Sequence, residues 1–250
     1  MKNSIILLVA CVSTSLVRAQ DSYTKSLSGV NWVKIESKAD ITVNTHSKNE
    51  LLIKANNNFE VSEKAKGLRL VGEGGEDNTD VGFYVVQDGN TLIVKNLRKN
   101  EQAIILLPKD QNVSVTSTWN GDIDVDGFTG EVEANARLNG SVDIRNVNGP
   151  VTANALNGNI DVFFNKVKQD SPISIYTTNG AVDVSMPSDT PAQLSLSSTN
   201  GEIYSNFDLK RDEKEGLKSY SRRSVKASIN NGGVNISLKS TNGNIYLRKE

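Results

Sequence analysis

Apolar and polar residues alternate in short stretches through the second half of the chain, and each stretch begins two residues after a glycine. Ile123 and Val125 follow Gly121, so the unit is Asn-Gly-x-apolar-x-apolar. The same two positions are apolar after Gly130, Gly140, Gly158, Gly180 and Gly243. An alternation of period two is typical of a half-buried β-strand and not of a helix. The pattern therefore predicts an all-β protein made of short strands.

The glycines of these units belong to a repeated Asn-Gly pair. The pairs are Asn120-Gly121, Asn139-Gly140, Asn148-Gly149, Asn157-Gly158, Asn179-Gly180, Asn200-Gly201, Asn231-Gly232 and Asn242-Gly243, with a degenerate copy at Thr129-Gly130. Glycines 121, 130, 140, 149 and 158 are nine or ten residues apart, and glycines 158, 180 and 201 are 22 and 21 apart. Self-similarity at a fixed period indicates a repeat architecture. The spacing predicts coils of about 20 residues with two corners each.

Two architectures can use an Asn-Gly pair at each turn. A sharp turn often needs positive φ, which glycine adopts freely and asparagine tolerates. In a meander each pair would be a tight antiparallel hairpin. In a parallel β-solenoid each pair would be a corner, and stacked asparagines could form amide ladders. The recurrence of the same residue types favours the solenoid, in which Ile160 pairs in parallel with Val142 or Val182.

The first part of the mature chain is less regular but also alternates. We expect residues 22–110 to form irregular strands that cap the stack, and residues 111–250 to form the regular repeats. A charged run at residues 208–226 interrupts the repeat and predicts a loop inserted on one face. No linker separates these parts, so residues 20–250 are expected to form a single domain.

The N-terminus has the pattern of a secretory signal peptide. Lys2 precedes an apolar run from Ile5 to Val17, and Ala19 offers a cleavage site that would leave Gln20 first. An alternative places the cut before Cys11, because residues 8–11 resemble a lipoprotein lipobox. Cleavage after residue 19 is favoured, since only ten residues would precede Cys11. Export to the periplasm, the outer surface or the medium is therefore expected, with no transmembrane segment in the mature chain.

Composition narrows the possible functions. Hydrophobic residues make up 37% and charged residues 23% of the chain, which suits thin β layers better than a thick helical core. Removal of residues 1–19 leaves 26 basic and 29 acidic side chains and no cysteine. A nucleic-acid partner would favour a basic excess, so none is expected. Disulfides cannot hold the mature fold.

Two stretches of the chain resemble a known family. Residues 119–125 (WNGDIDV) and 194–204 (LSLSSTNGEIY) resemble the bacterial "putative adhesin" β-strand-repeat family, and autotransporter-head-like adhesin domains are similar. The resemblance is concentrated in residues 113–208 and implies a parallel β-solenoid, often exported or tethered to a membrane. It implies no catalytic or binding residues.

One stretch formally matches a calcium-binding loop. Asp122, Asp124, Asp126, Gly127 and Glu133 fit the pattern D-x-D-x-D-G-x5-E, whose oxygens would ligate the ion. That loop needs flanking helices, whereas this stretch is predicted strand. The aspartates are better explained as an outward, solvated row, with weak surface calcium binding as the alternative. We therefore predict no metal site and no cofactor.

Catalytic chemistry has few candidates. His46 is the only histidine, and no zinc-ligand spacing or nucleophile motif is present. Acids such as Asp124, Asp143 and Asp161 recur with the repeat, which favours a structural role over a catalytic one. Five aromatic residues could stack on sugar rings: Trp32, Trp119, Tyr176, Tyr204 and Tyr246.

The sequence is compatible with three functions. The favoured one is a non-catalytic surface or envelope module, an adhesin or structural scaffold whose partner would be a cell-surface glycan or protein. The alternative is a carbohydrate-active β-helix enzyme or a glycan-binding protein. The third is a sensor or scaffold subunit in envelope-stress signalling, for which the sequence offers no direct feature.

Overall fold

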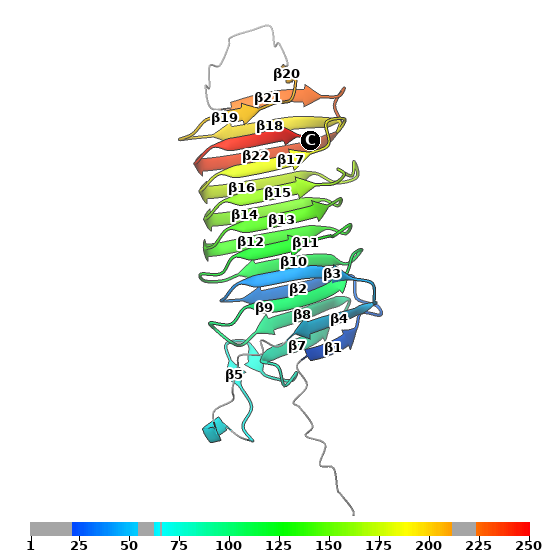
Figure 1. Ribbon diagram of the computed structural model, residues 1–250, viewed down its shortest axis with the longest axis vertical. Helices are drawn as coiled ribbons and strands as arrows, with labels where there is room; N and C mark the ends of the chain where they lie inside the picture. Colours follow the sequence, from blue (N-terminus) through cyan, green and yellow to red (C-terminus); the bar gives the residue numbers. More distant parts are fainter. Residues whose placement is uncertain (1–21, 55–62, 66, 212–223) are drawn as a thin grey trace, which may run out of the picture.

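The computed structural model describes residues 22–54, 63–65, 67–211 and 224–250. Nearly all regular structure in these ranges is β-strand, stacked along one long axis (Figure 1). The exceptions are a single turn of 3-10 helix, η1 (Glu63–Ala65), and a small hairpin of β5 (Val71–Gly72) and β6 (Gly75–Glu76). The predicted signal peptide, with Cys11, lies outside the described residues. No helix in the described ranges is long and apolar enough to cross a membrane.

Two large sheets form the body of the protein. In spatial order, the ten-stranded sheet contains β1 (Ser22–Ser26), β4 (Glu50–Lys54), β9 (Ala103–Pro108), β3 (Ile41–His46), β11 (Ile123–Asp126), β13 (Val142–Val147), β15 (Ile160–Phe164), β17 (Val182–Met186), β23 (Ile245–Lys249) and β19 (Ile203–Ser205). In spatial order, the eleven-stranded sheet contains β20 (Lys210–Arg211), β21 (Ser224–Ile229), β18 (Ala192–Ser198), β22 (Val234–Asn242), β16 (Ile173–Asn179), β14 (Val151–Asn157), β12 (Val132–Asn139), β10 (Asn112–Ser117), β2 (Trp32–Ser37), β8 (Thr91–Asn96) and β7 (Phe83–Asp88). We call a consecutive pair of strands, one from each sheet, a coil.

Strand pairing within the regular coils is parallel. Ile160 pairs with Val142 on one side and with Val182 on the other, both in parallel register. This confirms the pairing expected for a solenoid and excludes a hairpin across Asn157-Gly158. The protein is therefore an all-β protein with long parallel sheets.

The alternation of each strand sends every second side chain into one shared core. Ile41, Ile123, Val142, Ile160 and Val182 are in register, and none of them is exposed to solvent. The inward rows of both sheets belong to a single hydrophobic cluster. Because β-branched residues fit a pleated, buried surface, the same residue types recur at these positions from coil to coil.

The spatial order of the coils departs from their order in the chain at both ends. The coil β2–β3 lies between β8–β9 and β10–β11, so it is an ordinary member of the stack and not one of the caps. The coil β22–β23 lies between β16–β17 and β18–β19. The C-terminus accordingly lies within the stack in Figure 1 and not at its end. The coil containing Asn242 therefore separates the coil containing Asn179 from the coil containing Asn200, although Asn179 and Asn200 are only 21 residues apart in the chain.

Antiparallel strands close both ends of the stack. At one end β1 pairs with β4, β4 with β9, and β7 with β8. At the other end β18 pairs with β21 and β21 with β20. The expectation of a loop over the whole of residues 208–226 was therefore wrong at its two edges, which form β20 and the start of β21. Residues 212–223 of that predicted loop lie outside the described residues.

Candidate functional site

A ladder of asparagine amides runs along the stack, and four of its members end the strands β12, β14, β16 and β22. Each Nδ2 donates to the Oδ1 of the neighbouring asparagine, over distances of 2.7 to 3.1 Å. In spatial order its members are Asn120, Asn139, Asn157, Asn179, Asn242 and Asn200. Each inner amide both donates and accepts, whereas Asn120 only accepts and Asn200 only donates within the ladder, so these polar groups are paired from coil to coil. We call this the asparagine ladder.

The glycine after each ladder asparagine lets two coils approach closely. A Cβ added at Gly158 would lie 2.0 Å from the carbonyl oxygen of Gly140, and one at Gly180 would lie 2.1 Å from that of Gly158. The same approach occurs at Gly121, Gly140, Gly201 and Gly243. Positive φ, the expected reason for glycine, applies to Gly140 and Gly180 but not to Gly158. The more general reason is that backbone lies where a side chain would begin.

The other two Asn-Gly pairs lie away from this ladder. Gly149 instead approaches Gly130, and a Cβ added at Gly149 would lie 2.0 Å from the Gly130 carbonyl oxygen. Asn148 precedes this glycine, and its backbone N–H donates to the Phe128 carbonyl. Asn231-Gly232 lies in the connection between β21 and β22. The sequence pattern alone gave all eight pairs the same role.

The formal calcium motif is not assembled. Asp122 precedes β11 of the ten-stranded sheet and Asp126 ends it, whereas Glu133 lies on β12 of the other sheet. The Asp122 carboxylate accepts a hydrogen bond from the Ser141 backbone at 2.7 Å, and that of Asp126 accepts one from the Asn146 amide at 2.7 Å. No group of three or more potential ligands able to hold a metal ion occurs in the part of the chain that is described.

Four aspartates instead form a row across the outer face of the ten-stranded sheet. Asp124, Asp143, Asp161 and Asp183 pair in register on adjacent strands. Burial raises the pKa of Asp161 above its ordinary value, and the carboxylates of Asp143 and Asp183 raise it further. Burial is also the main cause of the raised pKa of Asp124, with a contribution from Asp143. We call these four residues the aspartate row.

Two arginines partly offset the charge of the aspartate row. Arg145 contacts the Asp143 carboxylate. Arg248 binds both oxygens of Asp183 through its Nε and Nη2 atoms, with contacts of 2.8 to 3.1 Å. No cation pairs with the carboxylates of Asp124 or Asp161 among the described ion pairs. With four aspartates and two paired arginines, the row keeps a net negative charge.

Two tyrosines continue the row beyond Asp183. Tyr246 pairs with Asp183, and Tyr204 pairs with Tyr246 on the last strand of the sheet. Their ring centroids are 5.3 Å apart with an interplanar angle of 11°, and Arg248 lies 5.3 Å from the centroid of the Tyr246 ring. Tyr204 is 52% exposed, and both rings line a shallow hollow together with Asn206. We call Tyr204 and Tyr246 the tyrosine pair.

The other residues singled out in the sequence lie apart from the tyrosine pair. Tyr176 projects from β16 on the outer face of the opposite sheet, and Trp119 is exposed just after β10. Trp32 begins β2 in the same sheet as Tyr176. His46 contacts the carbonyl of Glu50 at 2.8 Å through its Nε2 atom, which closes the turn between β3 and β4. The structure thus brings together only two of the five aromatic residues.

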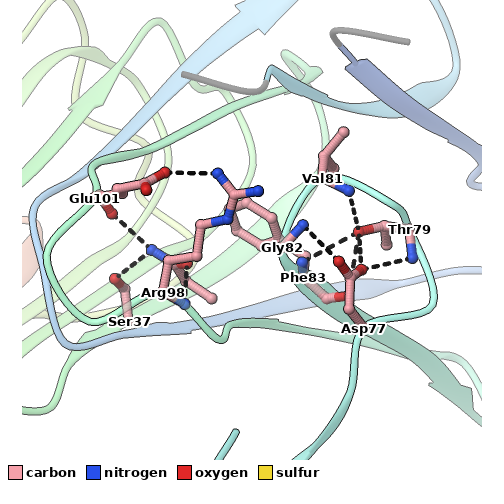
Figure 2. Close-up of polar contacts among 9 residues, drawn as sticks. Ser37, Asp77, Thr79, Val81, Gly82, Phe83, Arg98 and Glu101 are labelled. Carbon is pink, nitrogen blue, oxygen red and sulfur yellow. Dashed lines mark hydrogen bonds and ion pairs between the residues drawn. The ribbon is translucent and has the colours of Figure 1, made fainter. Parts of the chain in front are cut away.

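A dense polar cluster at one end of the stack was not anticipated from the sequence (Figure 2). The Asp77 carboxylate accepts hydrogen bonds from the backbone of Thr79, Asp80 and Gly82 and from the Thr79 hydroxyl, at 2.8 to 3.1 Å. The only available signal was the local sequence DNTDVG, since aspartate followed by threonine and glycine is typical of Asx turns. We call residues 77–83 the cap loop.

Arg98 fixes the cap loop to the next loop of the chain. Its side chain passes over Gly82, where an added Cβ would lie 2.1 Å from the Arg98 Nε atom. The Arg98 guanidinium pairs with Glu101 at 2.7 Å, and both side chains are mostly buried. Val81 and Phe83 point into the core beneath this pair. The cluster therefore closes the core and is not an open binding site.

The architecture and the comparison with known proteins agree on the class of this protein. It is an all-β protein with long parallel sheets and a repeated face. The chain belongs to the Toastrack DUF4097 family, whose model matches residues 111–248, more than half of its length. This match confirms the family that residues 113–208 suggested.

Two solved structures resemble the chain at low identity. One is a "putative cell adhesion protein" from Clostridium sporogenes, with 12% identity, coverage of 92% of this chain and 99% of that chain, and a TM-score of 0.42. The other is a "putative adhesin" from Bacteroides fragilis, with 12% identity, coverage of 92% and 96%, and a TM-score of 0.41. Scores this low support no argument about function. No curated protein matches the chain.

The aspartate row leads to a prediction about pH. As the pH rises past about 3.9, the aspartates of the row lose their protons in the unfolded chain before they lose them in the folded protein. The free energy of unfolding therefore falls with rising pH until the row is also ionised in the folded protein. Asp161→Asn should therefore raise the free energy of unfolding at pH 7 by about 0.5 kcal/mol, since like charges opposite each other destabilise a sheet. Urea unfolding at pH 3 and pH 7 measures the effect, which should be smaller at pH 3.

A matched control separates the row from general charge effects. Asp88→Asn removes an exposed aspartate at the end of β7, outside the row. Its effect on the free energy of unfolding is the baseline against which that of Asp161→Asn is compared at each pH. A variant Asp161→Asn that is less stable than the unsubstituted protein at pH 7 would contradict the interpretation of the row.

Proposed function

We propose that this protein is an exported, non-catalytic surface module, an adhesin or scaffold whose solenoid displays the aspartate row and the tyrosine pair. The observation that supports it is the repetition of the outward residues. Asp124, Asp143, Asp161 and Asp183 recur once per coil, as a structural pattern does. A catalytic site would instead require a convergent, unrepeated group of residues in a cleft.

Two features of the repeat support this proposal. Ladder partners are 18, 19 or 22 residues apart where the coils follow chain order, which agrees with a coil of about 20 residues. The ladder asparagines and their glycines act as corners that let neighbouring backbones touch. On this proposal residues 20–250 form one domain, stabilised along its length by contacts between neighbouring coils.

Export is the second element of the proposal. It rests on Lys2, the apolar run that follows and the cleavage site after Ala19. Mass spectrometry of the protein from its native host should find a chain that starts at Gln20. A lipid-modified Cys11 would instead establish an anchored lipoprotein, and an intact Met1 would refute export.

A glycan is the partner that the tyrosine pair favours. Aromatic rings with a polar edge are common where one side of a ligand is apolar and the other is wet, as in a sugar ring. Asn244 donates to the Tyr246 hydroxyl at 2.9 Å, and Asn206 fixes the Lys249 backbone, so the hollow beside Tyr204 is held in shape. On this proposal a sugar ring contacts the exposed Tyr204 ring.

Binding arrays of glycans and matrix proteins test the proposal directly. We expect the mature chain to bind at least one glycan, and Tyr204→Ala to abolish that binding while the fold is retained. Tyr176→Ala is the matched control, because Tyr176 is also partly exposed but lies on the other sheet. Loss of binding in both variants, or in neither, would exclude the tyrosine pair as the site.

An activity screen separates the module from an enzyme. We expect no turnover of polysaccharides by the purified chain. A reproducible kcat that one aspartate or glutamate substitution abolishes would refute the non-catalytic proposal.

A further inference from the structure

The last coil of the chain occupies a position between two coils that are consecutive in sequence. The strands β16–β17 lead through residues 187–191 to β18–β19, yet the C-terminal coil β22–β23 lies between these two coils. It pairs in parallel with β16 and β18 in one sheet and with β17 and β19 in the other. We call this position the insertion slot.

The C-terminal coil makes the same kind of contact with each of the two coils that form the walls of the insertion slot. Residues 194–204 (LSLSSTNGEIY) and 236–246 (ISLKSTNGNIY) are nearly identical. The Ser240 hydroxyl donates to the Gly180 carbonyl at 2.8 Å, and the Ser198 hydroxyl donates to the Gly243 carbonyl at 2.8 Å. None of these contacts depends on which copy of the chain supplies the inserted coil, because they involve only the coil and the two walls of the slot.

The connection into the slot is backbone-strained. β21 and β22 lie on opposite sides of β18, so residues 230–233 must cross over the beginning of β18. Asn230, Asn231 and Gly232 are consecutive residues with φ of 48°, 69° and 79°. Asparagines in this left-handed region store strain that a more open connection would release.

Two glycines allow the crossing. A Cβ added at Gly232 would lie 2.4 Å from the Gln193 Nε2 atom, and one at Gly233 would lie 2.5 Å from the Pro191 carbonyl oxygen. Gln169 anchors the far side, where its Oε1 accepts from the Val234 N–H at 2.9 Å. The connection is therefore short, close to its neighbours and strained, which is the kind of hinge that favours exchange of an element between copies.

We propose that the C-terminal coil exchanges between copies of this chain, so that the coil of one copy fills the insertion slot of a second copy. The exchanged state keeps every contact between coil and slot, and it opens the strained connection at residues 230–233. Exchange of an identical element is a low-cost route to a dimer, because only the hinge differs between the two states. Since the hinge is short and lies beside the β20–β21 end, the copies meet at that end. This inference does not depend on the proposed glycan binding.

Site-directed cross-linking in the full chain tests the exchange. Ser174 of β16 and Ser237 of β22 are paired in register and face outward. With Cys11→Ser in every variant, one sample of the chain contains Ser174→Cys and a second, isotopically labelled sample contains Ser237→Cys. The two are mixed at high concentration, warmed, cooled and treated with a short bismaleimide. We expect a covalent heterodimer joined between residues 174 and 237, identified by mass spectrometry.

Two controls make the outcome decisive. Ser114 lies three strands from Ser174 in the same outward row, so a mixture of Ser114→Cys with Ser174→Cys gives the background of random encounters. The 174–237 heterodimer should exceed it several-fold. In a single chain with both Ser174→Cys and Ser237→Cys, an intramolecular link reports the unexchanged state. A heterodimer yield no greater than background at every concentration, with the intramolecular link formed normally, would overturn the proposal.

The hinge supplies a second, independent variant. Asn231→Gly removes most of the strain at its left-handed residue, so it should lower the fraction of exchanged dimer. Sedimentation of chains without any introduced cysteine measures this fraction after the same warming step. A fraction of dimer that Asn231→Gly leaves unchanged or increases would contradict the role of the strained connection.

Discussion

Gly158→Ala is expected to destabilise the protein by about 3 kcal/mol, because the new methyl group meets fixed backbone and not a movable side chain. The added Cβ would lie 2.0 Å from the Gly140 carbonyl oxygen and 2.9 Å from the Ser141 nitrogen. Neither atom can withdraw without separating two coils whose strands are paired in register at Val142 and Ile160. Urea unfolding followed by circular dichroism measures the loss.

Gly29→Ala is the control that separates close approach from backbone strain. Gly29 has a φ of 75°, but an added Cβ there meets nothing within 4 Å. Only the left-handed conformation is penalised, at a cost of about 1 kcal/mol. If Gly29→Ala lowered the free energy of unfolding as much as Gly158→Ala, close backbone contact would not be the reason for a glycine after each ladder asparagine. Hydrogen exchange should further show that the damage at Gly158 spreads first to the adjacent coils.

The strands and their pairing could be predicted from the sequence because two signals agree. Period-two alternation assigns each inward residue, and the repeat places equivalent residues on neighbouring strands. Ile160 therefore had two candidate partners, Val142 and Val182, and the structure pairs it with both. The same reasoning identified amide ladders as a property of stacked asparagines, although it could not distinguish Asn148 from the ladder members.

The order of the coils could not be predicted, because local patterns are the same in either position. The segments around Asn200 and Asn242 both contain the sequence STNG followed by isoleucine and tyrosine, so each fits beside Asn179 equally well by sequence. The choice depends on the antiparallel cap and on the connection at residues 230–233, which are tertiary features. Glycine was similarly ambiguous, because positive φ and close backbone approach select the same residue.

Only part of the candidate site could be predicted from the sequence, because the rest depends on the order of the coils. Outward aspartates follow from the alternation, and their repetition was evident. The contact between Tyr204 and Tyr246 exists because the C-terminal coil is inserted beside β19, so it depended on the coil order. A pair of aromatic residues 42 positions apart gives no local signal of contact.

The cap loop offers the second large effect, since Asp77 alone satisfies four hydrogen-bond donors. Its Oδ1 accepts from the Thr79 N–H, the Thr79 hydroxyl and the Asp80 N–H, and its Oδ2 accepts from the Gly82 N–H. Asp77→Ala would leave the N–H groups of Thr79, Asp80 and Gly82 without this acceptor next to the buried Val81, while the Thr79 hydroxyl could still donate to the Phe83 carbonyl at 3.1 Å. We expect a loss of about 2–3 kcal/mol, because hydrogen bonds to a charged group contribute more than neutral ones and unmet buried donors are costly.

Asp77→Asn sharpens this prediction because it keeps one oxygen in place. The amide Oδ1 can still accept from Thr79 and Asp80, but the Nδ2 group would then face the Gly82 N–H, donor against donor. Its loss of stability should therefore fall between those of the unsubstituted protein and Asp77→Ala. Hydrogen exchange at Gly82 and Phe83 should accelerate in the same order, while amides of the central strands such as β14 change less. A variant Asp77→Ala that unfolds within about 0.5 kcal/mol of the unsubstituted protein would mean that Arg98 and Glu101 alone hold the cap loop over the core.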